Sequence, residues 1–366
     1  MSQTKVKLLY MDIYRVHLYV ENAPQWREWF VRKLGFQAIS STTNNDTHTE
    51  LVQNGEVRFL ISSPRTNANP VAKFLQHHPP GVAELDFAVD NLELIWERAT
   101  NAGAKILQPI QEKNSIKWGK ISGWGDLCHT FIQVNRISSA DFGGLKNYGA
   151  SEINHNFITH INSEFTGIDH VVLNVANGEL EPALNWYETT LGFQRQQRFK
   201  IETEHSGLSS QVLVYPGGRA QLPINEPTSA NSQIQEFLDA NNGAGIQHIA
   251  LSNKDIFATV RHLRNQGVPL IEVPTSYYEN LRLRRGELNI YQLQQLEELQ
   301  ILVDWQQDNP DALLMQTFTK PIFPQPTLFL ELICRSRKAK GFGEGNFRAL
   351  FEAVEREQMK RNRGVC

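Results

Sequence analysis

Cysteine is scarce in this chain: Cys128, Cys334 and Cys366 are the three cysteines among its 366 residues. They are widely spaced and form no Cys-x-x-Cys pair, so the sequence suggests neither a thiolate zinc site nor a disulfide framework. Such sparse cysteine usage fits a reducing compartment. We therefore expect a cytoplasmic protein.

Long apolar runs and a strong net charge are also missing. No run of about 18 or more apolar residues occurs, so no spanning helix is expected, and the first residues lack the apolar core of a signal peptide. The formal net charge of -3 gives no electrostatic reason to expect a nucleic acid or a membrane as partner. With 40% hydrophobic and 20% charged residues, the composition is that of a soluble globular protein, long enough for two domains.

What the chain does contain is an internal repeat. The strand-like segment 13–20 and its counterpart 168–175 each lead into a helical pattern that ends in Leu-Gly-Phe, and segment 81–85 recurs as 245–249. Repeats of this length indicate duplicated structural units. We predict an α+β protein of two halves, each with two strand-helix-strands units in a curved, mainly antiparallel sheet with helices on its outer face. The predicted parts are an N-terminal domain (1–136), a polar linker (137–165) and a C-terminal domain (166–366).

Three polar residues stand in apolar, strand-like segments: His170, His248 and Glu331. A polar side chain in such a segment costs free energy unless it finds a partner. Two histidines and a carboxylate are the set that holds non-haem Fe(II) and leaves positions open for substrate and dioxygen. A lone buried histidine is more often a satisfied core residue, but these histidines open corresponding strands of neighbouring units. We therefore predict that the three side chains converge as metal ligands.

The repeat predicts that the N-terminal half lacks this site. Its corresponding positions, in the same order, are Arg15, Glu84 and Gln133. Arginine stays protonated and cannot be a ligand, and one carboxylate with one amide cannot hold a first-row transition metal alone. We expect Arg15 and Glu84 to form an ion pair instead, and His17, which is out of register with the set, to be structural.

Six segments of the C-terminal half complete the sequence pattern. In chain order they are Leu222–Pro227, Ser232–Phe237, Gly243–Leu251, Phe318–Pro321, Pro326–Glu331 and Gly341–Phe347. Together they resemble the 4-hydroxyphenylpyruvate dioxygenase family over residues 168–358, whereas the N-terminal half matches only in its general pattern. The family belongs to the vicinal-oxygen-chelate group, so the resemblance implies that each half consists of paired βαβββ modules.

The resemblance also implies a reaction. It is the Fe(II)-dependent conversion of 4-hydroxyphenylpyruvate and O2 to homogentisate and CO2, by decarboxylation, ring hydroxylation and migration of the side chain. The substrate is itself a 2-oxo acid, so no separate 2-oxoglutarate is needed. The sequence leaves open whether the product enters tyrosine degradation or prenylquinone synthesis. We expect a homo-oligomer, a dimer or tetramer, with the N-terminal half as a candidate interface.

The resemblance further implies roles for individual residues, with His170, His248 and Glu331 as the iron ligands. It places polar positions of the substrate cavity at Ser210, Asn225, Gln233, Gln247 and Gln316, and substrate contacts at Phe318, Phe329, Phe342, Asn346 and Phe347. Neutral amides suit this task because they can hold a phenol and a keto acid without competing for iron. Gln247 directly precedes a ligand, so on a regular strand it points to the opposite face. Two alternatives stay open for Gln247: a position behind the ligands, outside the cavity, or a position in the cavity into which strand twist turns it.

The end of the chain carries an apolar stripe at helical spacing. Phe347, Leu350, Phe351 and Val354 predict an amphipathic helix over about 346–360, which Asn346 can cap. From the pattern alone, the helix can simply pack on the sheet. The resemblance favours a lid that excludes water from the reaction, with glycines 341, 343 and 345 as its hinge.

Several rival predictions stay open. Hydroxymandelate synthase resembles this family and shares its substrate and metal but hydroxylates the side chain; Phe347 favours the ring-hydroxylating branch. Extradiol catechol dioxygenases share the modules but lack the segments 222–227 and 341–347. A metal-free binding protein of the same fold would not need both histidines and the glutamate. The geometry of the loop over 285–312, where the sequence departs from the expected tight hairpin, is left open.

Overall fold

The computed structural model describes residues 10–133, 165–203, 206–284, 290–306 and 308–362. The first half contains strands β1 (Met11–Tyr19), β2 (Gln37–Thr43), β3 (Thr47–Asn54), β4 (Val57–Pro64), β5 (Gly81–Val89), β6 (Ile106–Lys113), β7 (Ile116–Ser122) and β8 (Cys128–Gln133), with helices α1 (Ala23–Leu34), α2 (Pro70–His77) and α3 (Leu92–Asn101).

The second half contains strands β9 (Phe165–Asn174), β10 (Gln194–Glu202), β11 (Gly207–Val214), β12 (Gln221–Pro227), β13 (Gly245–Asn253), β14 (Leu302–Gln306), β15 (Asn309–Phe318) and β16 (Phe329–Arg335). Its helices are α4 (Leu180–Leu191), α5 (Gln233–Asn241), α6 (Ile256–Asn265), α7 (Thr275–Arg284), α8 (Ile290–Leu299), the short 3-10 helix η2 (Ser336–Lys338) and α9 (Glu344–Asn362).

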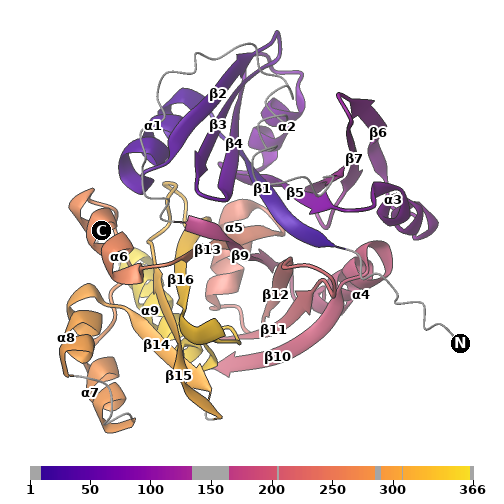
Figure 1. Ribbon diagram of the computed structural model, residues 1–366. Coiled ribbons are helices and arrows are strands. Elements are labelled where there is room, and N and C mark those ends of the chain that lie inside the picture. The colour runs from indigo at the N-terminus through magenta and orange to yellow at the C-terminus, as the bar shows by residue number, and fades with distance from the viewer. Residues whose placement is uncertain (1–9, 134–164, 204–205, 285–289, 307, 363–366) are drawn as a thin grey trace, which may run out of the picture.

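These strands form two sheets with the same permuted order, β2-β3-β4-β1-β5-β8-β7-β6 and β10-β11-β12-β9-β13-β16-β15-β14. In each sheet, two βαβββ units close by parallel pairing of their first and last strands, as in β1 with β4 and β13 with β16. The units join through an antiparallel pair, β1 with β5 or β9 with β13. The predicted α+β fold of paired βαβββ units in two curved sheets is confirmed (Figure 1).

Strand alternation separates the two faces of each sheet. In β9, Val171 and Leu173 enter the apolar core that includes side chains of α4, whereas His170 and Val172 line a cavity on the other face. Successive side chains of a strand point to opposite faces. The helix-covered face thus stabilises the fold and leaves the second face for chemistry.

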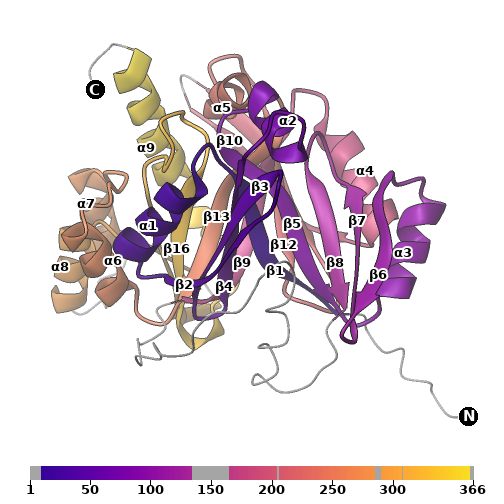
Figure 2. The same cartoon turned by 90° about the horizontal axis from the view of Figure 1, so that it is seen from above.

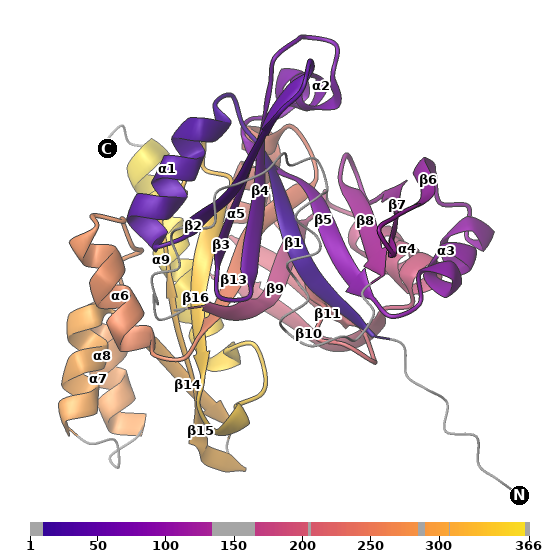
Figure 3. The same ribbon diagram turned by 45° about the horizontal axis from the view of Figure 1, so that its top comes forward.

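The two halves pack against each other rather than standing apart. One apolar core cluster contains residues of both, and the ring centroids of Trp26 in α1 and Phe323 lie 4.4 Å apart. His129 in β8 is fully buried and lies 3.0 Å from the hydroxyl of Tyr187 in α4. Figures 2 and 3 show α3 beside α4 at this contact, and α6, α7 and α8 grouped at the far end of the C-terminal sheet.

The strand registers correct one equivalence of the predicted repeat. Glu331 lies opposite Ala250 of β13, and its counterpart opposite Asp86 of β5 is Thr130. The predicted counterpart Gln133 is therefore wrong by three positions. Its side chain instead accepts a hydrogen bond of 2.8 Å from the backbone N–H of Leu92, at the first residue of α3.

The predicted ion pair between Arg15 and Glu84 is also wrong, because the register between β1 and β5 places each of them opposite another residue. Arg15 lies opposite Asp86 and binds it at 2.5 Å. Glu84 lies opposite His17, whose Nδ1 is 3.4 Å away, and it also accepts a hydrogen bond of 2.8 Å from Lys120. Burial opposes ionisation of Glu84, but the hydrogen bond from His17 and the charge of Lys120 hold its pKa well below the ordinary value.

Some expectations lie beyond what the structure tests. The predicted linker falls almost wholly on residues 134–164, outside the described residues, so the domain boundaries stay a prediction, as does the homo-oligomer. In the open loop region, α8 and the β14–β15 hairpin occupy most of the described part. Within the described ranges no helix combines the length and the apolar composition needed to cross a membrane.

Candidate metal centre and its cavity

His170, His248 and Glu331 converge at the middle of the C-terminal sheet. They lie on β9, β13 and β16, which are neighbours in the order of the strands, and one ligand atom from each lies within 4.8 Å of the others. His170 and Glu331 flank Ala250 in register, and His248 shares the face of Ala250 on β13. The alternation of three adjacent strands therefore brings the set together, although the sequence spacing of its members is long.

The donor atoms point at one another. The distance from His170 Nε2 to Glu331 Oε2 is 3.3 Å, and from His248 Nε2 to the same oxygen it is 3.6 Å. Burial alone would lower the pKa of His170, but the charges of Glu331 and Asp169 raise it to about 9. Burial and the neighbouring His170 lower the pKa of His248. Two imidazole nitrogens and a buried carboxylate oxygen around one point form a donor set that fits Fe(II).

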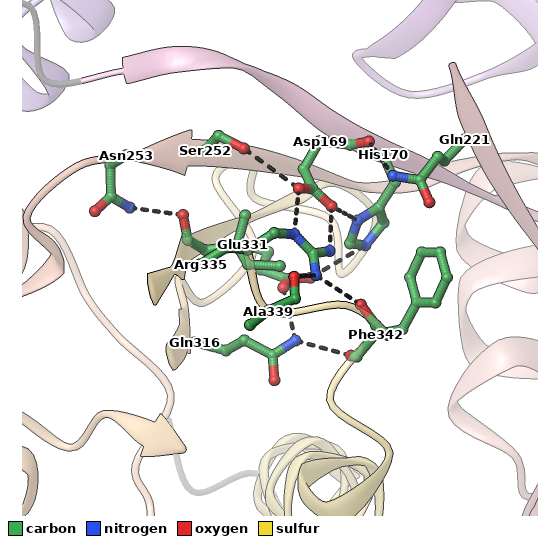
Figure 4. A network of polar contacts seen from close by, with 12 residues as sticks. Asp169, His170, Gln221, Ser252, Asn253, Gln316, Glu331, Arg335, Ala339 and Phe342 are labelled. Atoms are coloured by element: carbon green, nitrogen blue, oxygen red, sulfur yellow. Dashed lines mark hydrogen bonds and ion pairs between the residues drawn. The ribbon is translucent and has the colours of Figure 1, made fainter. Parts of the chain in front are cut away.

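A carboxylate behind the site orients one of these imidazoles, as Figure 4 shows. Asp169 Oδ1 lies 2.9 Å from Nδ1 of His170, which leaves Nε2 free to act as a donor to metal. Asp169 adjoins His170 in sequence and would point away on a regular strand. The register of β9 shifts between Ile168 and His170, and such a bulge re-aims a side chain. The sequence did not point to Asp169, because on a regularly alternating strand the neighbour of a ligand faces away from it.

A cavity of about 770 Å³, including space open to solvent, extends from the three residues. All ten other predicted site residues line it: Ser210, Asn225, Gln233, Gln247, Gln316, Phe318, Phe329, Phe342, Asn346 and Phe347. The other lining residues, which the sequence did not assign to the site, are Val172, Phe199, Ile201, Leu208, Val212, Pro223, Ile234, Leu350, Phe351 and Val354; the last three were predicted only as part of the apolar stripe of the C-terminal helix. Several were detectable as neighbours at i, i+2 of predicted ones, such as Leu208 and Val212 beside Ser210.

Gln247 reaches the cavity for the same reason that Asp169 reaches its histidine. The register between β9 and β13 shifts between Ile246 and His248, so Gln247 is the extra residue of a bulge and not part of the regular alternation. Gln247 can therefore line the cavity although it directly precedes a ligand. The bulge accounts for this orientation, so neither strand twist nor a position outside the cavity has to be assumed.

The polar groups of the cavity fall into two sets. Gln316 donates to Glu331 Oε1 at 2.9 Å and to the carbonyl of Phe342 at 3.0 Å, and accepts from Asn346 at 2.9 Å. It is thus occupied in holding a predicted ligand and the end of the chain. By contrast, the side chains of Ser210, Gln233 and Gln247 form no hydrogen bond with other described residues, although all three are buried. These are available to a ligand.

The C-terminal helix α9 closes the cavity over the sheet. Phe347 contacts Phe199 edge-on with 4.8 Å between ring centroids, and the ring of Phe342 lies 5.4 Å from that of His170. The helix begins at Glu344 and so includes Asn346, whose predicted role as its cap is wrong. Asn346 instead bonds Gln316 and the hydroxyl of Tyr277, the latter at 2.8 Å.

Comparisons with known proteins agree with this architecture. Residues 15–142 match the family described as "Hydroxyphenylpyruvate dioxygenase, HPPD, N-terminal", and residues 167–284 match the "Glyoxalase/Bleomycin resistance protein/Dioxygenase superfamily". An uncharacterized protein of Synechocystis is 36% identical, covering 94% of this chain and 97% of its own. The 4-hydroxyphenylpyruvate dioxygenase of Yarrowia lipolytica is 38% identical, covering 96% of this chain and 94% of its own.

A solved structure extends the likeness to three dimensions. A triple mutant of 4-hydroxymandelate synthase from Streptomyces coelicolor superposes with a TM-score of 0.81 at 26% identity, covering 96% of this chain and 100% of its own. The strand order, the converging His-His-Glu set and the full-length relatives point the same way. The chain belongs to the 4-hydroxyphenylpyruvate dioxygenase family of the vicinal-oxygen-chelate superfamily.

Proposed function

We propose that this protein uses Fe(II) and O2 to convert 4-hydroxyphenylpyruvate to homogentisate and CO2. The observation that carries the proposal is the buried convergence of His170, His248 and Glu331 at one end of a mostly apolar, aromatic-lined cavity. Fe(II) held by these residues would activate dioxygen and hold the 2-oxo acid group of the substrate. The chain's own residues then bind, orient and shield.

The cavity has two polar ends, which suit the two polar ends of the substrate. The metal ligands come from β9, β13 and β16, whereas Ser210 and Asn225 face each other in register on β11 and β12. Asn225 is in register with Asn174, four residues beyond His170 on β9, a separation of about 13 Å along a strand. This span leaves room for one aromatic ring with a short acid side chain. We assign the phenol to the end with Ser210, Asn225 and Gln233.

Aromatic side chains beside the metal ligands would hold the ring, since Phe329 is in register with His248 and Phe318 with Glu331. Phe329 stacks on the imidazole of His248 with 4.8 Å between centroids, and Phe318 contacts Phe329 edge-on at 6.3 Å. Offset and edge-on aromatic contacts of this kind are favourable. Phe347 enters from the opposite side on α9. The ring would thus be fixed between the sheet and the helix, close to where dioxygen is activated.

The helix also keeps water out. Gly345 of α9 donates its backbone N–H to Asp304 at 2.9 Å, Glu355 accepts a hydrogen bond from Ser206 at 2.5 Å, and Lys320 lies 2.7 Å from Glu357. Contacts at the start and in the second half of α9 hold it down over the cavity. Excluding water protects a strong oxidant from side reactions.

A second function has a specific observation in its favour, namely the similarity to the synthase structure at TM-score 0.81. In that reaction the same substrate is hydroxylated on its side chain. We favour ring hydroxylation because Phe347 fills the wall beside Phe199 and restricts where the ring can move. The fate of the product, in tyrosine degradation or prenylquinone synthesis, follows only if homogentisate is formed.

The test is aerobic incubation of the purified protein with Fe(II), ascorbate and 4-hydroxyphenylpyruvate, followed by identification of the product. Homogentisate and CO2 in equal amounts, with matching O2 uptake, would support the proposal. 4-Hydroxymandelate without homogentisate would replace it by the synthase function. Anaerobic titration with Fe(II) addresses the third possibility, because a metal-free binding protein would show no binding, or binding unchanged by His248→Ala.

A further inference from the structure

Arg335 connects the candidate metal centre with the start of the C-terminal helix (Figure 4). It lies at the end of β16, and its Nε and Nη2 each donate to a carboxylate oxygen of Asp169 at 2.8 Å. Its Nη1 donates to the backbone carbonyls of Ala339 and Gly341, at 3.2 and 2.7 Å. A planar guanidinium presents donors in a fixed fork, so a single side chain can bind a carboxylate on one edge and carbonyls on another.

The carboxylate side of this bridge leads to the metal ligand. Asp169 lies 2.9 Å from Nδ1 of His170 and also accepts a bond of 3.3 Å from Ser252. Burial would raise the pKa of Asp169, but the hydrogen bonds from Arg335 and His170 hold it well below the ordinary value. Partners of this kind fix the tautomer and the ring orientation of a metal-binding histidine.

The carbonyl side leads to the segment on which α9 turns. Gly341 and Gly343 adopt φ of 85° and 81°, a left-handed conformation that favours glycine. Phe342 between them contacts the His170 ring, and its carbonyl accepts from Gln316. A Cβ at position 343 would lie 2.0 Å from Gln316 Oε1. The hinge is therefore packed closely against the site. If α9 moved away from the sheet, these contacts with His170 and Gln316 would be lost.

We propose that Arg335 is a positioning residue that couples the closed position of α9 to the orientation of His170, acting through Asp169. Arg335 lines neither the cavity nor the donor set. When the hinge moves away, Arg335 loses two carbonyl acceptors and water gains access to its pair with Asp169. The imidazole is then held less firmly. Coupling between two sites is reciprocal, so a metal held by His170 should in turn favour the closed helix. The identity of that metal rests on the proposed function.

The test is Arg335→Lys, with Arg337→Lys as matched control. Lysine keeps the charge but lacks the fork that can bond both sides. Arg337 lies two residues on, and its one ion pair among the described residues is with the exposed Asp311, at 2.8 Å. Amide hydrogen exchange of residues 341–350 is followed with and without Fe(II) under anaerobic conditions, and Fe(II) affinity is measured by titration. Neither readout needs turnover.

We expect exchange at 341–350 in metal-free Arg335→Lys to be faster by about tenfold, and Fe(II) affinity to fall by about 10–100-fold, as for other partners of metal-binding histidines. The decisive result is that Fe(II) slows exchange at the hinge in the wild type and in Arg337→Lys, but much less in Arg335→Lys at saturation. Equal protection by metal in all three proteins would overturn the coupling.

A second variant keeps the inference testable if Arg335→Lys fails to fold. Asp169→Asn keeps the shape of the side chain and contacts no backbone carbonyl of the hinge, so faster exchange at 341–350 in this variant would support transmission through Asp169, and unchanged exchange would refute it. The outcomes also separate two failures. Coupled exchange and metal binding without turnover of 4-hydroxyphenylpyruvate would refute the proposed function alone, whereas normal turnover with uncoupled exchange would refute this inference alone.

Discussion

The two halves of this chain share one sheet design but differ at three equivalent positions. Where the C-terminal sheet carries His170, His248 and Glu331, the strand registers place Arg15, Glu84 and Thr130 in the N-terminal sheet. The first set converges in an arrangement that can hold a metal ion. In the second set, Arg15 is paired with Asp86, and Glu84 with His17 and Lys120. The comparison teaches that the scaffold supplies a polar centre in both halves, while the residues on it decide whether it can hold a ligand.

The sharpest way to break the comparison is to change one buried carboxylate of each centre. Glu331→Gln removes the anionic donor, so bound Fe(II) should be lost and activity should fall by at least about 10³-fold, since the chemistry depends on the metal. Glu84→Gln, at the counterpart of His248, is the control and should leave the iron content per chain unchanged. Iron is measured by elemental analysis after anaerobic loading. Loss of iron in both variants would mean that the two centres are not independent.

The N-terminal centre should matter for stability instead. The Asp86 side chain is 1% exposed and the Arg15 side chain 13%, so their ion pair is largely shielded from water. Burial and the charge of Glu84 raise the pKa of Asp86 to about 7 despite Arg15. Above that pH, Asp86→Asn leaves a buried guanidinium without its counter-charge, which should lower the free energy of unfolding by about 3–5 kcal/mol. Urea unfolding followed by circular dichroism measures this. The control, Asp311→Asn, breaks an exposed pair with Arg337 and should cost less than about 1 kcal/mol. Similar losses in the two variants would contradict the assignment.

A third difference lies where the halves meet. Burial lowers the pKa of His129 to about 4 from an ordinary value of 6.5. The folded protein therefore holds His129 neutral beside Tyr187. This contribution to stability is complete above pH 6.5 and is lost as the pH falls toward 4, with a total on the order of 3 kcal/mol.

Urea unfolding at a series of pH values, in the wild type and in His129→Gln, isolates this contribution. Glutamine keeps a hydrogen-bonding group near the Tyr187 hydroxyl but does not titrate. The variant should therefore lose less stability between pH 6.5 and 4 than the wild type does. Parallel pH profiles would show that His129 is not the group responsible.

Much of this arrangement followed from the sequence. The repeat predicted the fold, and the apolar segments around the two histidines and Glu331 indicated which polar residues share a site. What escaped were departures from regular strands. The bulges that turn Asp169 and Gln247 toward the site depend on pairing between distant strands, which no local pattern records. The predicted pair of Arg15 with Glu84 was wrong for the same reason. The register between β1 and β5 places Asp86, two residues beyond Glu84, opposite Arg15.

The correction at Gln133 leads to the smallest effect. Gln133 and Cys334 occupy corresponding places, three residues beyond Thr130 and Glu331, and each stands near the end of its strand, close to the first residue of a helix. Gln133 accepts from the backbone N–H of Leu92 at 2.8 Å. The Cys334 thiol donates to the carbonyl of Lys254 at 3.7 Å, and the nearby backbone of Ile256 partly offsets the rise that burial causes in the pKa of the thiol. The first N–H groups of a helix lack partners within it, so Gln133 completes the start of α3, whereas Cys334 lies beside the start of α6 and can offer only its sulfur to the N–H of Ile256.

An amide oxygen is a strong acceptor and a thiol is a weak one. Gln133→Ala should therefore lower the free energy of unfolding by about 1 kcal/mol, and Cys334→Ala should remove less of the capping contribution, apart from the apolar contact that its small side chain loses. Amide exchange at Leu92 and Ile256 separates the two contributions, because only the hydrogen bond protects those groups. Faster exchange at Ile256 than at Leu92 in the wild type would agree with a weaker cap, whereas unchanged exchange at Leu92 in Gln133→Ala would remove Gln133 from this role.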